Sequence, residues 1–302
     1  MTSSGLIVLS SEAFSAALAP AAGGSLAFWR EKTATGDIDL MRPASEKALA
    51  EKKAEDSAMY PLVPYSNRIL GGSFIYWGIR RKVPQNHPAV PHPLHGEGWK
   101  TCWNVDYQGE NRAVLSFSHD GKKGFPFAYF AQNTFTLEGS VLTVLMKLTN
   151  KGAIPMPCGL GLHPFFPKDD DTLVTFRNRT LWATNTDTVF EKPIKPPPES
   201  QFSNGIRIAK VFLDDCFGGC DGRAEMVWPS RKLKINISAQ SDFNHMVVWS
   251  PKGEDFFCIE PVTNTTDAFN LASHGITGTG VKTLAPEESL TEKIAFTVTH
   301  LD

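Results

Sequence analysis

The stretch KLKINIS, residues 232–238, alternates polar and aliphatic side chains in steps of two. Leu233, Ile235 and Ile237 therefore share one face of an extended chain, whereas in a helix they would be spread around the axis. This period predicts a strand with one buried face. The same alternation recurs in KIAFTVT, residues 293–299, close to the end of the chain. It is the pattern that decides the fold.

Similar extended segments follow one another along most of the chain, separated by turn-forming Gly, Asn, Asp and Pro residues. Helical patterns rarely intervene between them. The predicted strands cover residues 113–119, 128–137, 140–150, 171–176, 224–228, 245–250 and 255–261. With no internal repeat and no domain boundary, this series predicts an all-β protein in which residues 1–302 form a single domain, one large antiparallel β-sandwich.

Three other segments complete the expected architecture. Residues 5–29 are interpreted as two strands around a turn at 20–24 rather than as a signal peptide, because no basic region precedes them and Glu12 interrupts the apolar run. Residues 45–58 carry the one persuasive helical pattern and are expected to form a surface excursion. The proline-rich run 192–198 is interpreted as a rigid surface connection.

The chain of 302 residues has a formal net charge of −2, from 30 Lys and Arg against 32 Asp and Glu. This balance, without a basic block, indicates neither a nucleic acid nor a membrane as a partner. The five cysteines are odd in number and have no paired CxxC spacing, which favours reduced, mostly buried thiols in a cytoplasmic protein. The expected partner is a neutral small molecule, and both a monomer and a homodimer remain open.

Five short motifs place polar or ionisable side chains among apolar, proline or glycine neighbours. They are YPLVPYSNRI with Asn67 and Arg68, PHPLHGEGW with His92 and His95, GLGLHPFFP with His163, FFCIEPVT with Glu260, and VFLDDCF with Asp214 and Asp215. An unpartnered charge in such surroundings is costly in free energy. Each motif therefore needs either a structural or a functional reason.

Glu260 and His163 are the least easily explained of these residues. Glu260 follows the apolar run FFCI, and the proline after it is expected to stop the strand, which places the carboxylate at a rim. A strand-end glutamate in solvent is the alternative. His163 stands between two glycines and an expected proline turn, a mounting that suits a proton donor. A core histidine bonded to a carbonyl oxygen is the alternative there.

The remaining candidates also have plain structural explanations. Arg68 can pair with a surface acid, and His95 can be a simple turn residue. One of Asp214 and Asp215 is expected to form a turn before Gly218. The choice depends on whether the motifs belong to one site.

Several common kinds of chemistry lack their sequence markers. The histidines are scattered, and His92 and His95 are separated by a proline, so no metal site is predicted. The motifs GxSxG, GxGxxG and GxxxxGK[ST] do not occur. What remains is proton transfer without a cofactor by a carboxylate and an imidazole, with an arginine and a second histidine to hold an oxygen-rich ligand.

Taken together and in their order along the chain, these motifs resemble the aldose 1-epimerase (galactose mutarotase) family. The similarity begins with PAAGGSLAFW, residues 20–29, which is like the family's first hairpin, and extends to LAPEESLTEKIAF, residues 284–296, which is like its closing strand. The resemblance implies a large β-sandwich with an open cleft on its concave face. In that cleft a monosaccharide in its pyranose form is opened and reclosed at C1, and no metal or cofactor is needed.

The resemblance also implies roles for individual residues. Glu260 corresponds to the general base that removes the proton of the C1 hydroxyl, and His163 to the acid that protonates the ring oxygen. The substrate-binding residues correspond to Arg68, His95, Asp214 and Asn67. Asp215 competes with Asp214 for its role, although the "LD" context favours the first.

These roles require an ionised Glu260 and a protonated His163. We expect a nearby carboxylate to raise the pKa of His163 by more than desolvation beside the two following phenylalanines lowers it. We also expect an aromatic side chain, either Trp249 or Trp99, to stack on the apolar face of the sugar.

Two departures from the family pattern leave the preferred sugar open. HPFFP stands where galactose-active members have His, two aromatic residues and Asn, and HPLHG stands where they have an Asn-rich version. A hexose-6-phosphate 1-epimerase is the nearest alternative, with Arg177, Arg179 and Arg207 as candidate phosphate-binding residues. A non-catalytic sugar-binding protein of the same fold is the other.

Overall fold

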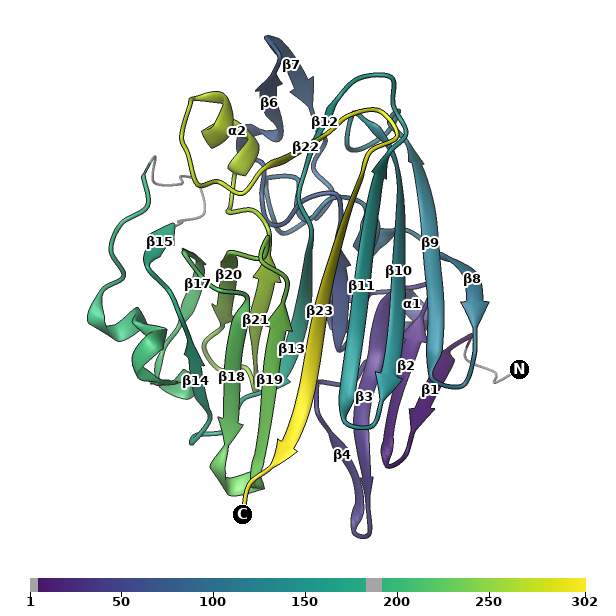
Figure 1. The fold of residues 1–302 in the computed structure, drawn as a ribbon, viewed down its shortest axis with the longest axis vertical. Helices are drawn as coiled ribbons and strands as arrows, with labels where there is room; N and C mark the ends of the chain where they lie inside the picture. The colour runs from purple at the N-terminus through teal and green to yellow at the C-terminus, as the bar shows by residue number, and fades with distance from the viewer. Residues whose placement is uncertain (1–4, 183–191) are drawn as a thin grey trace.

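The computed structural model describes residues 5–182 and 192–302, and its main elements are two large antiparallel sheets (Figure 1). The ten-stranded sheet contains β1 (Ile7–Ser11), β2 (Phe14–Ala19), β3 (Ser25–Thr33), β4 (Gly36–Asp39), β5 (Met59–Leu62), β13 (Gly161–Pro167), β15 (Thr180–Trp182), β17 (Leu213–Gly218), β20 (His245–Ser250) and β21 (Phe256–Val262). The nine-stranded sheet contains β8 (Asn104–Gln108), β9 (Arg112–Asp120), β10 (Ala128–Glu138), β11 (Val141–Asn150), β14 (Leu173–Phe176), β16 (Ile206–Arg207), β18 (Arg223–Trp228), β19 (Leu233–Ala239) and β23 (Ser289–His300).

Smaller elements connect and flank the two sheets. Two short strand pairs are β6 (Ser73–Tyr76) with β7 (Ile79–Lys82) and β12 (Met156–Cys158) with β22 (Lys282–Leu284). The α-helices are α1 (Glu46–Glu51) and α2 (Ala268–Ser273). Single 3₁₀ turns are η1 (Ala54–Asp56), η2 (Leu70–Gly72), η3 (Gly98–Lys100), η4 (Pro198–Ser200), η5 (Phe202–Asn204), η6 (Ile208–Lys210) and η7 (Pro229–Arg231).

Strand order determines which distant segments meet. The ten-stranded sheet follows β1-β2-β3-β5-β13-β21-β20-β17-β15, with β4 paired to β3, so β13 lies between β5 and β21. The nine-stranded sheet follows β16-β14-β18-β19-β23-β11-β10-β9-β8. The middle of the ten-stranded sheet therefore joins segments from the first, middle and last thirds of the chain.

The alternation read from the sequence is confirmed in β19 and β23. Leu233, Ile235 and Ile237 are 3%, 0% and 1% exposed, and the residues between them are half-buried. The other predicted strands are also present, with small shifts at their ends. Full burial of an aliphatic or Phe side chain contributes about 1.5–3 kcal/mol, which explains why this period directs the fold.

Aromatic side chains fill the space between the two sheets. Phe296 of the nine-stranded sheet meets Trp29 and Phe166 of the other, each with a ring-centroid distance of 6.4 Å. Trp228 meets Phe257 across the same layer at 6.3 Å. The predicted all-β sandwich is thus confirmed.

Two local predictions need correction. Residues 5–29 form three strands instead of two, because Glu12 adopts a left-handed conformation (φ 51°) and makes an extra tight turn between β1 and β2. Residues 45–58 form only the short helix α1, capped by Ser45 as its pattern indicates. A left-handed Lys52 (φ 57°) ends α1, which is largely exposed as expected for a surface excursion. The following turn η1 carries Glu55 and Asp56 to the wall of a cavity.

Three expected turns or strand ends are strands in the structure. GLGLHPFFP contributes β13, so His163 lies within a strand and not before a turn. Strand β21 continues through Pro261 to Val262, so Glu260 is not at a strand end. Asp214 and Asp215 both lie in β17 instead of in a turn.

Pro164 of β13 and Pro261 of β21 coincide with a gap in the ladder between these strands. Paired residues stop at Gly161 and Val262 and resume at Phe165 and Cys258. Both the proline after His163 and the one after Glu260 lie in this gap, where a missing N–H breaks no hydrogen bond between β13 and β21, while Pro164 still pairs with Met59 of β5 and Pro261 with Met246 of β20. The gap therefore leaves His163 and Glu260 facing each other on adjacent strands.

All five cysteines are free thiols, and Cys102 is the exposed one. Within residues 5–182 and 192–302, no helix has the length and apolar character needed to cross a membrane.

Candidate active site

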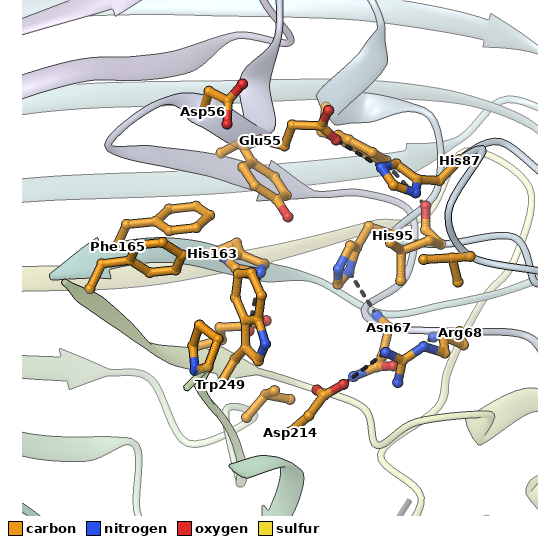
Figure 2. Close-up of a pocket in the computed structure, with 18 of the residues that line it drawn as sticks. Glu55, Asp56, Asn67, Arg68, His87, His95, His163, Phe165, Asp214 and Trp249 are labelled. Atoms are coloured by element: carbon orange, nitrogen blue, oxygen red, sulfur yellow. Dashed lines mark hydrogen bonds and ion pairs between the residues drawn. The ribbon is translucent and has the colours of Figure 1, made fainter. Parts of the chain in front are cut away.

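A cavity of about 530 Å³ opens on the ten-stranded sheet (Figure 2). Successive strand residues point to opposite faces, so Phe166 reaches the core while its neighbour Phe165 lines the cavity. The cavity therefore lies on the face turned away from the nine-stranded sheet. All six site residues chosen from the sequence line it: Asn67, Arg68, His95, His163, Asp214 and Glu260.

His163 and Glu260 form the deepest polar contact of the cavity. The distance from His163 Nε2 to Glu260 Oε1 is 3.3 Å, and the two residues are 5% and 2% exposed. The remaining polar atoms, His163 Nδ1 and Glu260 Oε2, find no hydrogen-bond partner in another described residue. Since buried polar atoms are normally paired, these two are available to a ligand.

Burial shifts both groups of this pair toward their neutral forms. Desolvation raises the pKa of Glu260 well above its usual value, Asp214 adds to the rise, and Arg68 opposes it. Desolvation lowers the pKa of His163 to about 3, and the positive charge of Arg42 acts in the same direction. The prediction that a carboxylate would raise the pKa of His163 is therefore wrong. Burial therefore favours an arrangement in which Glu260 holds a proton and His163 is neutral.

Aromatic rings explain this strong desolvation. The rings of Tyr60 and Phe165 stack on the imidazole of His163, with centroid distances of 4.6 Å and 4.7 Å. They come from β5 and from β13 itself. The Tyr60 and Phe165 rings are themselves 6.0 Å apart, so they flank the imidazole at an angle and cover it from neighbouring directions at the cavity wall.

Arg68 and Asp214 form an ion pair on another wall. Arg68 follows β5 and Asp214 lies in β17, and Arg68 Nη2 is 2.8 Å from Asp214 Oδ2. The Asp214 side chain is 47% exposed, so the pair sits at the open part of the cavity. Asp215 is not among the lining residues, as strand alternation requires.

His95 and Asn67 are joined by two hydrogen bonds. The Asn67 N–H donates to His95 Nδ1 and the His95 N–H donates to the Asn67 carbonyl, both at 2.9 Å. Because Nδ1 accepts, the hydrogen of the neutral imidazole is on Nε2. Burial lowers the pKa of His95 well below its usual value, and His163 and Arg68 act in the same direction. His95 is therefore a neutral hydrogen-bond donor.

Both residues sit in left-handed backbone conformations, Asn67 with φ 65° and His95 with φ 59°. The next residue, Gly96, also has a positive φ, and a Cβ there would lie 2.2 Å from the Val63 carbonyl oxygen. The "HG" of the PHPLHGEGW motif thus follows from close backbone packing.

Asn264 ties this loop to the end of β21. Its Oδ1 accepts from the Ser66 N–H and its Nδ2 donates to the Ser66 carbonyl, both at 3.1 Å. Arg68 is held in the same way by Asp267, whose N–H donates to the Arg68 carbonyl at 2.9 Å. The polar run after Glu260 therefore fixes the loop that carries Asn67 and Arg68.

The structure distinguishes the two tryptophans that were candidates for sugar stacking. Trp99 is 3% exposed, and its indole N–H is shared between the carbonyls of Leu94 and Gly96 at 3.2 Å and 3.1 Å. Trp249 is only half-buried and stands edge-on to His163, with a centroid distance of 6.0 Å. Trp249 is therefore the tryptophan that presents ring surface to the cavity.

Other lining residues were missed in the sequence. Arg42 lies over the rings of Phe165 and Phe256, with its guanidinium carbon 3.8 Å and 4.5 Å from their centroids. His87 Nε2 is 3.1 Å from Glu55 Oε2 across the cavity mouth. These residues carried no usable signal, because charges in a helical pattern and a histidine in a proline-rich loop are typical of solvated surface.

Several sequence candidates lie elsewhere. His92 accepts from the Gly71 N–H at 3.3 Å and does not line the cavity. Arg177 lines a separate surface hollow, and neither Arg179 nor Arg207 reaches the cavity. Among the described residues, no three His, Cys, Asp or Glu side chains are grouped as metal ligands.

Comparisons with known proteins agree with this architecture. A sequence model of the family described as aldose 1-epimerase matches residues 5–297. The uncharacterised protein YphB of Escherichia coli K12 is 27% identical over 282 residues, which cover 91% of this chain and 92% of the relative. A candidate aldose 1-epimerase from the same organism has a crystal structure with a TM-score of 0.88 and 25% identity, covering 98% of this chain and 99% of that chain.

A second solved structure, of a galactose mutarotase-like protein from Clostridium acetobutylicum, has a TM-score of 0.82 and 19% identity. It covers 97% of this chain and 95% of that chain, and at this identity it shows the fold alone. The region that the family model matches includes every residue that lines the cavity.

Proposed function

The chain belongs to the aldose 1-epimerase family, and from that premise we propose that it interconverts the α and β anomers of a free aldose. The reaction is acid–base opening and reclosure of the sugar ring. One observation supports it most directly: Glu260 and His163 touch at 3.3 Å inside a cavity of about 530 Å³, each with a polar atom left for a ligand. Cavities of 300–1,000 Å³ are typical of small-molecule sites.

Ring opening needs one proton to leave the C1 hydroxyl and another to reach the ring oxygen. With Glu260 as carboxylate and His163 as imidazolium, Glu260 takes the first proton and His163 supplies the second. Positioned proton transfer of this kind contributes about 10²- to 10⁴-fold in rate per group. Rotation about C1–C2 then presents the other face of the carbonyl, and the same steps in reverse give the other anomer.

The pKa shifts of Glu260 and His163 fit one half of this cycle. After ring opening the proton lies on Glu260 and His163 is neutral, which is the arrangement that burial favours. Before ring opening the charged arrangement is needed. A bound sugar supplies it, because a hydroxyl that donates to Glu260 Oε2 favours the carboxylate, and an oxygen that accepts from His163 Nδ1 favours the imidazolium.

The surrounding residues orient the ring. Arg68 and Asp214 offer donors and acceptors to hydroxyl groups, and His95 offers its Nε2 hydrogen. Asn67 contributes chiefly by fixing His95, and its own Oδ1 accepts from the Arg68 N–H at 2.9 Å. Trp249 provides the apolar surface for the ring face.

The charges of the cavity favour a neutral sugar over a sugar phosphate. Its acidic lining residues are Glu55, Asp56, Asp214, Glu254 and Glu260, against the two arginines Arg42 and Arg68. Arg68 is paired with Asp214, and Arg42 donates to the carbonyls of Glu55 and Ser57 at 2.7 Å and 3.2 Å. A phosphate dianion would meet this excess of acidic side chains, and one of the two arginines is already paired with a carboxylate.

The test is polarimetry of freshly dissolved α-glucose, α-galactose and glucose 6-phosphate, with and without the protein. We expect faster approach to anomeric equilibrium for a free sugar and little effect on the phosphate. A non-catalytic sugar-binding protein would bind the sugars without changing the rate. No acceleration on any aldose in a broader panel would contradict the proposed reaction.

A further inference from the structure

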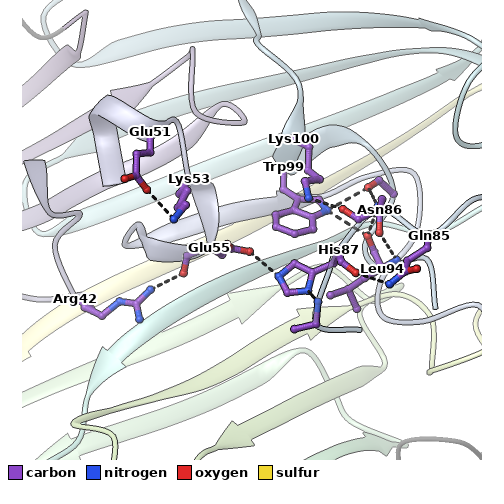
Figure 3. Close-up of polar contacts among 12 residues, drawn as sticks. Arg42, Glu51, Lys53, Glu55, Gln85, Asn86, His87, Leu94, Trp99 and Lys100 are labelled. Atoms are coloured by element: carbon purple, nitrogen blue, oxygen red, sulfur yellow. Dashed lines mark hydrogen bonds and ion pairs between the residues drawn. The ribbon is translucent and has the colours of Figure 1, made fainter. Parts of the chain in front are cut away.

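Asn86 makes three side-chain hydrogen bonds to the residues on either side of His95 (Figure 3). Its Oδ1 accepts from the Leu94 N–H at 2.8 Å, and its Nδ2 donates to the carbonyls of Leu94 and Gly96 at 2.8 Å and 2.9 Å. One carboxamide therefore holds the backbone immediately before and immediately after the histidine. No element of regular secondary structure supplies these bonds.

The opposite side of the same turn is fixed by a different segment. His95 exchanges two hydrogen bonds with Asn67, and the Gly98 N–H donates to the Val63 carbonyl at 3.1 Å. The Leu94 N–H, by contrast, has Asn86 as its acceptor. The turn is thus clamped between the segment after β5 and the Asn86 side chain.

We infer that Asn86 is a positioning residue for His95, which it keeps in the turn that directs the Nε2 hydrogen into the cavity. His95 is in a left-handed conformation, which costs free energy and persists only where the surroundings enforce it. Without Asn86 the Leu94 N–H loses its acceptor, and the carbonyls of Leu94 and Gly96 keep only the shared indole N–H of Trp99, so the turn can relax. The histidine would then miss the ligand by a distance that matters for orientation.

Gln85 offers a matched control in the same loop. Its Nε2 donates to the carbonyls of His87 and Val90, both at 2.8 Å. Like Asn86 it binds the main chain of the loop through its side-chain amide, but its partners His87 and Val90 do not flank His95. A general loss of loop order would make the two residues equally important.

This inference rests on the proposed function, and a double-mutant cycle tests it. We expect Asn86→Ala to lower kcat/KM about 10- to 100-fold and to have less than about a threefold effect when His95 is already Asn. Asn86→Asp keeps the acceptor for the Leu94 N–H and loses both donors, so it should fall between Asn86→Ala and wild type. Gln85→Ala should change kcat/KM by less than about twofold in either background.

A second measurement reads His95 without the reaction. Imidazole ¹⁵N NMR of the wild-type protein, assigned with His95→Asn, should show His95 protonated on Nε2, and Asn86→Ala should shift these signals toward averaged tautomers. If wild type is inactive but the NMR changes occur, the proposed function fails and the positioning role stands. Additive effects in the cycle together with unchanged His95 signals would overturn the role, as would Gln85→Ala being equally damaging.

Discussion

The two sheets of the sandwich differ in what covers their second face. Strand β10 of the nine-stranded sheet alternates buried and half-buried residues along its length, because one face joins the core and the other faces outward. Strand β21 of the ten-stranded sheet is buried at every position, because its second face is covered by the aromatic wall of the cavity. An ionisable residue costs little on the outward face of β10 and a great deal on β21. The difference shows where the fold keeps an ionisable side chain at a cost in stability, as the proposed function requires of Glu260.

Replacing one glutamate in each sheet gives the largest contrast. Glu260→Gln should lower kcat about 10²- to 10⁴-fold, since the amide cannot accept a proton, and His163→Asn should do the same. Glu225→Gln, which breaks a 3.1 Å pair with Lys234 on the nine-stranded sheet, should leave kcat unchanged. Polarimetric initial rates measure all three. A fully active Glu260→Gln protein would remove the assigned base.

Two tryptophans test the same contrast for apolar surface. Trp228 of β18 is fully buried and donates to the Pro167 carbonyl at 2.8 Å, so Trp228→Ala should lower the free energy of unfolding by about 3–5 kcal/mol. Trp249→Ala should lower the free energy of unfolding by less, because Trp249 is only half-buried. It should also raise KM, because Trp249 lines the cavity. Urea unfolding and sugar saturation curves separate the two effects. Equal stability losses with unchanged KM would contradict the stacking role.

Two arginine pairs provide a smaller contrast. Arg68→Ala removes a proposed ligand donor and breaks the 2.8 Å pair with Asp214, so we expect KM to rise about tenfold, or about 1.4 kcal/mol, with a smaller change in kcat. Arg231→Ala breaks a pair with Asp169, where Arg231 Nη2 lies 2.6 Å from Asp169 Oδ1 outside the cavity. It should leave KM unchanged and alter stability by less than about 1 kcal/mol. A larger effect on kcat than on KM for Arg68→Ala would assign that residue to the chemical step.

Glu292 of β23 gives the smallest expected effect, on the pH dependence of stability. Burial and the neighbouring Asp242 raise its pKa to about 7. A raised carboxyl pKa means that the folded state holds the proton more tightly, so stability falls as pH rises from about 4.5 to 7 and is flat above. Glu292→Gln should remove this decline, by roughly 1 kcal/mol, without changing activity. An unchanged pH profile in urea unfolding would show that Glu292 ionises freely.

The sheet that faces solvent on one side was the easier one to predict. The alternation of aliphatic and polar residues identified β19 and β23 directly, since every second side chain lies on the buried face of the sheet. The strands β5, β13 and β21 have no such period, because both faces are covered, and β13 was expected to be a turn on account of its prolines. Sequence rules could not foresee that the prolines of neighbouring strands share one gap in the ladder.

The sequence motifs identified part of the cavity lining. Five of the six chosen residues stand in motifs with proline or glycine neighbours, Asp214 stands among the apolar residues of VFLDDCF, and all six line the cavity. Arg42, Glu55 and His87 were missed because their positions depend on how short helices and loops pack. The predicted direction of the His163 pKa shift was wrong, because desolvation beside the rings of Tyr60 and Phe165 lowers this pKa. The sequence does not show which rings stack on His163, since that depends on tertiary packing.

The bond between Asn264 and Ser66 spans 198 positions of the chain. A nascent polypeptide therefore has no complete cavity until β21 and the polar run after it have left the ribosome. Until then β13 can pair with β5 on one side, and its other edge stays open for β21. Contacts of such high sequence separation form slowly. The recovery of enzymatic activity during refolding should consequently mark the final docking event, later than the appearance of β-sheet circular dichroism.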